Sequence, residues 1–439
     1  MPRNIARLVH TARELATATG TTRACAGLSR GALPSSRLRK VNHMVRRSAR
    51  TLPAALVLSL LSSSSALSTG TFELELFSPA KISVFTRILR RYDDGCHEVA
   101  SLSQTVDFGD RLRLARIPAD RFAAAGVVRP SRVTEPIKQH VELSVSPANP
   151  GIPLDESNLV VRAIALFRTK LAQRDGGSLT IPRFRAHLVK SIPPDSGLGG
   201  ASSNAATALW GVRSKRRDAP RGPPPSLTPA TYSPLSQANE LCGRPASAAE
   251  LEEWSRELGG DVACFLTRGS AFCHGRAVFH RPQNVDAIEP LTAADASASL
   301  YVVLPANAGQ LSTPRLFRTL ADGGYTSLSA SDPHDLLASH QAQSGAQHVN
   351  DLEPPALQCS SELAAVKQAL LAHGFHAVVL SGAGPALFAF GESGSDPQAL
   401  AQRATAAIAE STGAALDIRA AEFLSRESGG WYHAQGAVK

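Results

Sequence analysis

The sequence predicts an α+β fold. Extended and helical segments are interspersed along the chain, and they do not follow the regular strand–helix alternation of a doubly wound parallel sheet. The length of 439 residues exceeds that of a usual single domain, so we expect two domains plus appended segments. A hydrophobic content of 43% and a charged content of 19% are typical of a globular protein with a sizeable core.

The extended segments are indicated by apolar residues that alternate with polar ones. In residues 72–76 apolar residues alternate with acids, Pro79 interrupts the pattern, and residues 81–85 resume it. Further strands are predicted at residues 140–145, at residues 185–192, and on both sides of a Gly-Pro turn within residues 377–391.

The helical segments are indicated by apolar residues three or four positions apart. Residues 154–172 have this spacing, and Asp155 or Ser157 is expected to cap the first turn. The other helices are predicted at residues 202–210, 248–258 and 361–374, the last of them ended by Gly374.

Residues 1–70 have the composition of a targeting segment. Their net charge is +10, whereas the whole chain carries +9. Residues 71–439 therefore carry a net charge of −1, which gives no support to a nucleic-acid partner. The apolar run at residues 52–61 resembles a secretory signal and is too short to span a bilayer. We expect delivery to the plastid, by a transit peptide or by a signal-plus-transit route starting at Met44, and no membrane association of the mature protein.

Residues 212–237 interrupt the pattern between two predicted helices. They are basic and then rich in proline, serine and threonine, a composition that cannot bury enough apolar surface to fold. Two interpretations remain open: a disordered surface insertion, and a retained in-frame intron in the gene sequence.

The six cysteines form no CxxC pair. This spacing indicates neither a zinc site nor a disulfide framework. We therefore expect reduced thiols and no metal bound by protein ligands alone.

Residues 192–206, IPPDSGLGGASSNAA, combine three glycines and three serines before a helical run. Glycine can take positive φ and bring its backbone close to a ligand, and a following helix points its free N–H groups at the same place. The pattern is neither GxGxxG nor a P-loop, since no lysine follows the glycines. Composition alone leaves a phosphate cradle and a flexible loop equally open.

Four other features each have a functional and an ordinary interpretation. Asp261 is a base, a helix cap or a turn former, and Lys81 is a catalytic or a solvated lysine at the start of a strand. His97 is a ligand contact or a surface histidine. The turn at residues 380–387 is structural or closes over a site.

In this order the features resemble the GHMP small-molecule kinases: PAK, DGxHE, GLGGxSSNAA, LGxDxxxF and SGxGPxLF. The resemblance covers residues 72–391 apart from 212–237. It implies a two-domain α+β kinase fold with the active site in the cleft between an N-terminal ATP-binding domain, residues 71–282, and a C-terminal domain, residues 283–439.

The resemblance also implies the reaction. ATP, with Mg²⁺ bridging its oxygens, would phosphorylate a small-molecule hydroxyl without a covalent phosphoenzyme. The stretches at residues 93–112, 151–163 and 349–357 favour the branch that acts on a cytidine diphosphate-linked methylerythritol over homoserine and mevalonate types. The protein would be a monomer or a homodimer.

The resemblance assigns roles to individual residues. Lys81 and Asp261 correspond to the catalytic lysine and aspartate. The substrate-binding positions are Ser83, His97, Gly382 and Gly384. The ATP-binding positions are Asn158 and Lys190 beside the nucleoside and, around the phosphates, Pro193, Pro194, Asp195, Ser196, Gly197, Leu198, Gly199, Gly200, Ala201, Ser202 and Ser203.

The sequence departs from the family pattern at four of these motif positions. Cys96 replaces a tyrosine that would stack on cytosine, so we expect weaker substrate binding. Ser83 replaces an asparagine, and Asp195 and Ala201 replace glycines. These changes keep open the alternative of a catalytically impaired relative with a binding role.

Overall fold

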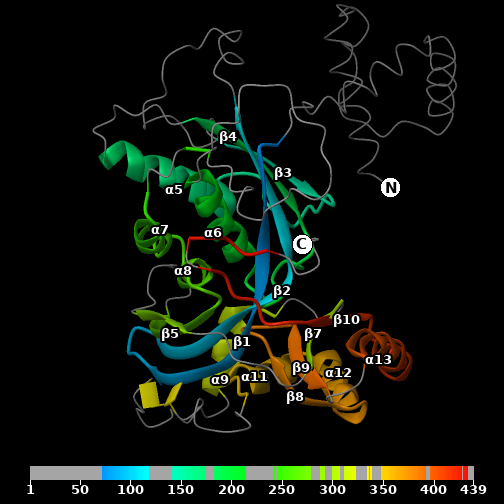
Figure 1. Cartoon of the computed structure of the whole chain (residues 1–439). Helices are drawn as coiled ribbons and strands as arrows, with labels where there is room; N and C mark the ends of the chain where they lie inside the picture. The colour runs from blue at the N-terminus through cyan, green and yellow to red at the C-terminus, as the bar shows by residue number, and fades with distance from the viewer. Residues whose placement is uncertain are drawn as a thin grey trace, which may run out of the picture. The chain divides into compact units, whose positions relative to one another are not determined.

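The part of the chain that the structure describes belongs to one compact unit, Thr71–Lys439 (Figure 1). In this computed structural model the described residues are 72–117, 141–174, 182–213, 241–242, 246–277, 287–291, 299–306, 311–322, 334–335, 337–338, 348–391, 396–427 and 429–433. The predicted targeting segment, and all but the first two residues of 212–237, lie outside them.

The first sheet has β2 (His97–Ile117) at its centre. β1 (Leu74–Arg91) pairs antiparallel with β2 along nearly its whole length. The other edge of β2 changes partner: its first half pairs with β5 (Ser270–Ala277) and its second half with β4 (Arg183–Val189). The sheet is completed by two edge strands, β3 (Val141–Ser146) parallel to β4, and β6 (Ala287–Leu291) antiparallel to β5.

Pro79 lies inside β1 and does not end it. The register of the β1–β2 pair shifts between Pro79 and Ala80, which is where a strand accommodates a residue without an N–H. The two predicted extended segments at residues 72–76 and 81–85 are therefore parts of a single strand.

Four helices accompany the first sheet: α5 (Leu159–Arg174), α6 (Gly200–Arg213), α7 (Ala248–Ser255) and α8 (Gly260–Leu266). Ala205, Ala206 and Ala208 of α6 are fully buried, so this part of the helix packs closely on β1 and β2. The predicted caps of α5 are wrong. Asn158 instead accepts the Val160 N–H at 2.9 Å, while Asp155 accepts the N–H of Ser157 in the preceding turn.

The second sheet has the order β10-β7-β9-β8. Its strands are β7 (Ser299–Pro305), β8 (Phe375–Leu380), β9 (Leu387–Gly391) and β10 (Leu416–Ala421), all antiparallel to their neighbours. The accompanying helices are α9 (Thr313–Asp322), α11 (Glu353–Cys359), α12 (Ser361–Ala372) and α13 (Pro397–Thr412). α12 packs on β8 and α13 on β10.

A buried apolar cluster joins the two sheets. Ile82 of β1 and Phe272 of β5 belong to it, and so do Val302 of β7 and Phe388 of β9. The division predicted at residues 282/283 stays a prediction, and the chain returns to the first core after β10, where Trp431 and Tyr432 are buried.

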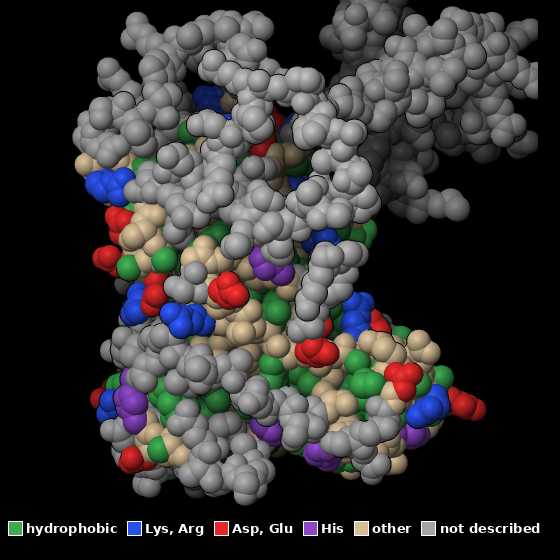
Figure 2. Space-filling model, in the orientation of Figure 1, with side chains coloured by type: hydrophobic (Ala, Val, Ile, Leu, Met, Phe, Trp, Pro, Cys, Tyr) green, Lys and Arg blue, Asp and Glu red, His purple; other side chains and the backbone are tan. Residues whose placement is uncertain are grey.

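No helix within the described residues has the length and apolar character needed to cross a membrane. On the face seen in Figure 2, basic and acidic side chains of the described residues are interspersed.

Candidate active site

A cavity of about 620 Å³ brings together most of the sequence-predicted site residues. Lys81 of β1 and Asp261 of α8 line it, together with Gly382 and Gly384 of the turn between β8 and β9. The predicted ATP-binding residues in its lining are Asn158, Lys190, Pro193, Pro194, Asp195, Ser196, Gly197, Gly199, Gly200, Ala201 and Ser202.

Leu198 and Ser203 lie beneath the cavity and do not line it. Leu198 is fully buried in the cluster between the sheets, and its carbonyl accepts the Lys81 N–H at 3.0 Å. The glycine-rich loop is therefore anchored by an apolar side chain and tied to the strand that carries the lysine. Such anchoring excludes the flexible linker as the interpretation of this loop.

The turn between β8 and β9 holds the glycine-rich loop. The Ser381 hydroxyl donates to the Gly197 carbonyl at 3.2 Å and accepts the Ser83 N–H at 3.3 Å. Gly197 has φ +82°, and a Cβ atom there would lie 2.1 Å from the Ser381 carbonyl oxygen. Only glycine fits at this contact.

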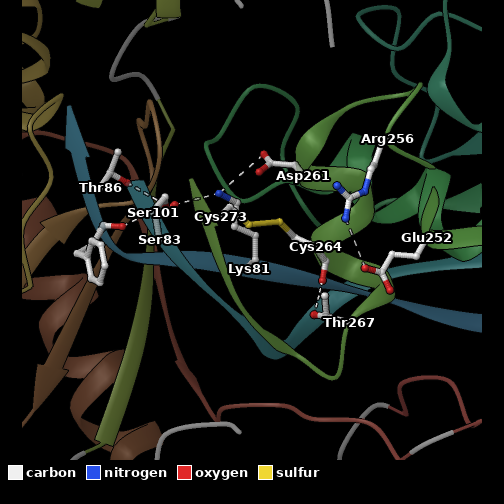
Figure 3. Close-up of a disulfide and its surroundings, with 11 residues drawn as sticks. Lys81, Ser83, Thr86, Ser101, Glu252, Arg256, Asp261, Cys264, Thr267 and Cys273 are labelled. Atoms are coloured by element: carbon white, nitrogen blue, oxygen red, sulfur yellow. Dashed lines mark hydrogen bonds and ion pairs between the residues drawn. A yellow bond between two sulfur atoms is a disulfide. The ribbon is translucent and has the colours of Figure 1, made fainter. Parts of the chain in front are cut away.

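Lys81 is 8% exposed, so the interpretation as a solvated lysine is wrong. Its Nζ donates to Ser83 Oγ at 2.9 Å and lies 3.8 Å from Asp261 Oδ2 (Figure 3). A lysine in this position stabilises negative charge on its neighbour and on any anion bound in the cavity.

Asp261 lies in the first turn of α8, and its side chain is 51% exposed. The N-cap of α8 is Gly259, which has no side chain to form a capping bond. Asp261 is therefore not the cap of this helix, and its carboxylate is accessible from the cavity.

His97 is buried, so the surface interpretation is wrong, and it lies outside the lining of the cavity. Its ring centroid is 4.6 Å from that of Phe317 on α9. Burial, and secondarily the charge of Arg91, lowers the pKa of His97 below its usual value, so the neutral ring is favoured.

Lys190 forms an ion pair with Asp110, a buried residue of β2. Its Nζ also donates to Asn204 Oδ1 at 3.1 Å. Asp110, Asn204, Phe317 and Ser381 were not predicted from the sequence. In the sequence Asp110 is one of two acids in residues 106–112, VDFGDRL, and no local pattern distinguishes it from Asp107.

The expectation of reduced thiols is wrong for one pair, because Cys264 and Cys273 form a disulfide (Figure 3). Gly269, with φ +117°, lies in the turn that reverses the chain after α8, so β5 comes to lie beside the helix. The disulfide connects α8, the helix that carries Asp261, to β5. Cys242 is not part of it, and burial raises the pKa of its thiol to about 12.

Among the described residues there is no group of three or more His, Cys, Asp and Glu side chains arranged to hold a metal ion. The buried Ser203 hydroxyl, in the first turn of α6, has no hydrogen-bond partner among these residues.

Comparison with known proteins identifies the family. The sequence matches the models of the GHMP kinases N terminal domain over residues 158–217 and of the GHMP kinases C terminal over residues 331–410. It is 30% identical over 361 residues to 4-diphosphocytidyl-2-C-methyl-D-erythritol kinase of Protochlamydia amoebophila (strain UWE25), and the match covers 82% of this chain and 93% of that protein.

A plant relative agrees with this family, and a solved structure agrees with the fold. The chain is 33% identical over 335 residues to the chloroplastic 4-diphosphocytidyl-2-C-methyl-D-erythritol kinase of Oryza sativa subsp. japonica, covering 75% of this chain and 67% of that one. The crystal structure of homoserine kinase from Cytophaga hutchinsonii is similar with a TM-score of 0.50 and 18% identity, over 81% of this chain and 95% of that one. The predicted α+β GHMP kinase fold is confirmed.

Proposed function

Because this chain belongs to the 4-diphosphocytidyl-2-C-methyl-D-erythritol kinases of the GHMP group, we propose that it transfers the γ-phosphoryl group of ATP to the 2-hydroxyl of 4-diphosphocytidyl-2-C-methyl-D-erythritol. This reaction is a step of the methylerythritol phosphate route to isoprenoids. The observation that carries the proposal is the meeting of Lys81 and Asp261 with the glycine-rich loop in one cavity.

In the proposed reaction Asp261 accepts the proton of the attacking hydroxyl. Its half-exposed carboxylate can accept a hydrogen bond from a substrate hydroxyl in the cavity. Lys81 places its positive charge 3.8 Å from this carboxylate and stabilises charge on the transferring group, and its hydrogen bond with Ser83 fixes its direction. Phosphoryl transfer depends mostly on positioning and charge stabilisation, which these residues provide.

The glycine-rich loop and the start of α6 would hold the ATP phosphates. A helix N-terminus presents unpaired N–H groups and the positive end of the helix dipole to an anion. When bound with ATP, Mg²⁺ would neutralise part of the phosphate charge. The hydroxyls of Ser202 and Ser203 fit such a group, because the Ser203 Oγ is buried and unpaired among the described residues.

His97 would contact the cytosine of the acceptor. Its neighbour Phe317 offers the aromatic surface that Cys96 does not provide. The two rings are in contact, so a base that binds His97 has to separate them.

A coupled assay with ATP, Mg²⁺ and the cytidine compound tests the proposed function, and Asp261→Asn is the decisive variant. We expect turnover by the wild type and a loss of about 10²–10⁴-fold in kcat for Asp261→Asn. Glu252→Gln is the matched control, since its carboxylate pairs with Arg256 on the protein surface. Turnover of homoserine or mevalonate alone would contradict the acceptor, and nucleotide binding without turnover would favour an impaired relative.

Three further parts of the proposal concern the whole protein. The chloroplastic plant relative supports delivery to the plastid stroma by residues 1–70. Fusion of this segment to a fluorescent reporter tests it, and a cytosolic signal would contradict it. Limited proteolysis tests the domain boundary at 282/283. Light scattering tests whether the protein is a monomer or a homodimer.

A further inference from the structure

Asp110 lies where β2 changes partner from β5 to β4. The last residue of β2 that pairs with β5 is Gln104, and the first that pairs with β4 is Arg111. The side chain of Asp110 has no solvent exposure. An ionised carboxylate in such a place requires several donors, because burial without them costs several kcal/mol.

Four donors surround the Asp110 carboxylate. Oδ1 accepts the N–H groups of Ser191 at 2.7 Å and Ile192 at 2.8 Å. Oδ2 accepts from Lys190 Nζ and, at 2.9 Å, from the amide of Asn204. A carboxylate has about four acceptor positions, so its hydrogen-bonding capacity is filled.

All four donors belong to the proposed ATP cradle or adjoin it. Ser191 and Ile192 lie where the chain enters the glycine-rich loop, and Lys190 and Asn204 line the cavity. Asn204 lies in α6, the helix whose N-terminus faces the same space. One side chain of β2 therefore connects the strand before the loop, the loop and the helix after it.

The position of Lys190 explains why a charge is needed. A Cβ atom on Gly200 would lie 3.4 Å from Lys190 Nζ, so the ammonium group lies beside the first residue of α6. A positive charge at the N-terminus of a helix is unfavourable. The Asp110 carboxylate offsets this repulsion and fixes the direction of the lysine.

We propose that Asp110 is a positioning residue for ATP. It holds Lys190 and the first residues of the loop in the conformation that binds nucleotide, and it does not contact the acceptor. This inference rests on the proposed function, because it takes the cavity to be an ATP site.

The test is the affinity for a non-hydrolysable ATP analogue, measured by calorimetry on the full chain. Asp110→Asn retains the size of the side chain but turns one acceptor into a donor facing other donors. We expect the analogue Kd and the KM for ATP to rise about tenfold or more, with kcat and the acceptor KM within about twofold. Asp107→Asn is the matched control: it lies on the same strand, accepts one backbone N–H, from Glu422, and is outside the cavity lining.

The double variant Asp110→Asn, Lys190→Met covers the case in which the single variant does not fold. Removing both charges avoids an unpaired buried lysine. We expect it to bind the analogue at least as weakly as Lys190→Met alone, because Asp110 holds both Lys190 and the start of the loop. Wild-type affinity in the double variant would overturn the inference.

Two other results would also overturn it. One is an analogue Kd within twofold of wild type in Asp110→Asn. The other is an equal change in both KM values with a loss of stability, which would indicate a structural role only. If the wild type binds the analogue but does not phosphorylate the cytidine compound, the proposed acceptor fails, and the analogue affinities still decide the role of Asp110. A wild type that binds no analogue would reject both.

Discussion

Lys81 Nζ lies 3.8 Å from Asp261 Oδ2, and the two side chains differ sharply in exposure. The lysine is buried on β1, whereas the aspartate is half exposed on a short helix. The buried partner is thus held in place by the sheet, and the accessible partner can meet a substrate hydroxyl. This asymmetry suits a pair in which one group fixes charge and the other moves a proton.

Replacement of Lys81 by methionine keeps the length of the side chain and removes its charge. We expect kcat to fall about 10²–10³-fold, because charge stabilisation of the transferring group is lost. The KM for ATP should change less. Lys170→Met is the control, since Lys170 forms a surface ion pair with Glu257. Steady-state kinetics measures both, and an unchanged kcat in Lys81→Met would remove this residue from the mechanism.

Gly197 and Gly374 separate two effects of adding a methyl group. Their φ angles are similar, +82° and +86°, but a Cβ at Gly197 meets the Ser381 carbonyl at 2.1 Å, whereas nothing lies within 4 Å at Gly374. We expect Gly374→Ala to cost about 1 kcal/mol of unfolding free energy with unchanged activity. Gly197→Ala should raise the KM for ATP at least about tenfold, because loop and turn must separate. Urea unfolding and kinetics of both variants are the measurements, and equal kinetic effects would contradict the role of the turn.

Much of the site could be predicted from the sequence, because its glycines and serines are contiguous. The loop at residues 192–206, and the motifs of Lys81 and Asp261, each carry a local signal. Most predicted helices and strands were found for the same reason, since periodicity is local. The extent of β2 was not predicted, because its apolar positions do not alternate regularly along 21 residues.

The missed residues depend on contacts between distant parts of the chain. Asp110 and Asn204 are 94 positions apart, and Ser381 lies 184 positions from Gly197. The pairing of Cys264 with Cys273 requires the helix and strand to lie side by side, which their spacing does not indicate. Such partners are fixed by the fold and leave no local pattern in the sequence.

Asp195 has φ +53° and an exposed side chain at the edge of the cavity. Its charge opposes bound phosphates, and its backbone conformation favours glycine. We expect Asp195→Asn, which removes only the charge, to lower the KM for ATP about two- to fivefold. Asp195→Gly should do the same and also stabilise the fold slightly. The difference in KM should shrink at high salt. A KM for ATP that is equal in all three proteins at low salt would show that the carboxylate does not affect the nucleotide.

The disulfide between Cys264 and Cys273 closes a short loop that includes the end of the helix carrying Asp261. We expect Cys264→Ser, or reduction by dithiothreitol, to lower the free energy of unfolding by about 2–3 kcal/mol. Cys359→Ser is the control, because Cys359 is a free thiol. Urea unfolding with and without the reductant measures the effect, together with a thiol titration of the oxidised protein. Reduction that leaves the stability of the wild type unchanged would argue against the cross-link.

The burial of His97 predicts how stability depends on pH. Burial lowers the pKa of His97 in the folded protein below its value of about 6.5 in the unfolded chain. The unfolded chain therefore binds more protons than the folded protein in mildly acid solution. The contribution of the neutral His97 to the free energy of unfolding is present above about pH 6.5, and it is lost as the pH falls through the pKa of His97 in the folded protein. Burial also lowers the pKa of His187, which changes the stability in the same direction. We expect His97→Gln to flatten the fall in unfolding free energy between about pH 7 and pH 5, while His433→Gln, at an exposed position, leaves the slope unchanged. Urea midpoints across this range measure the slope, and identical slopes in the wild type and His97→Gln would show that His97 does not control it.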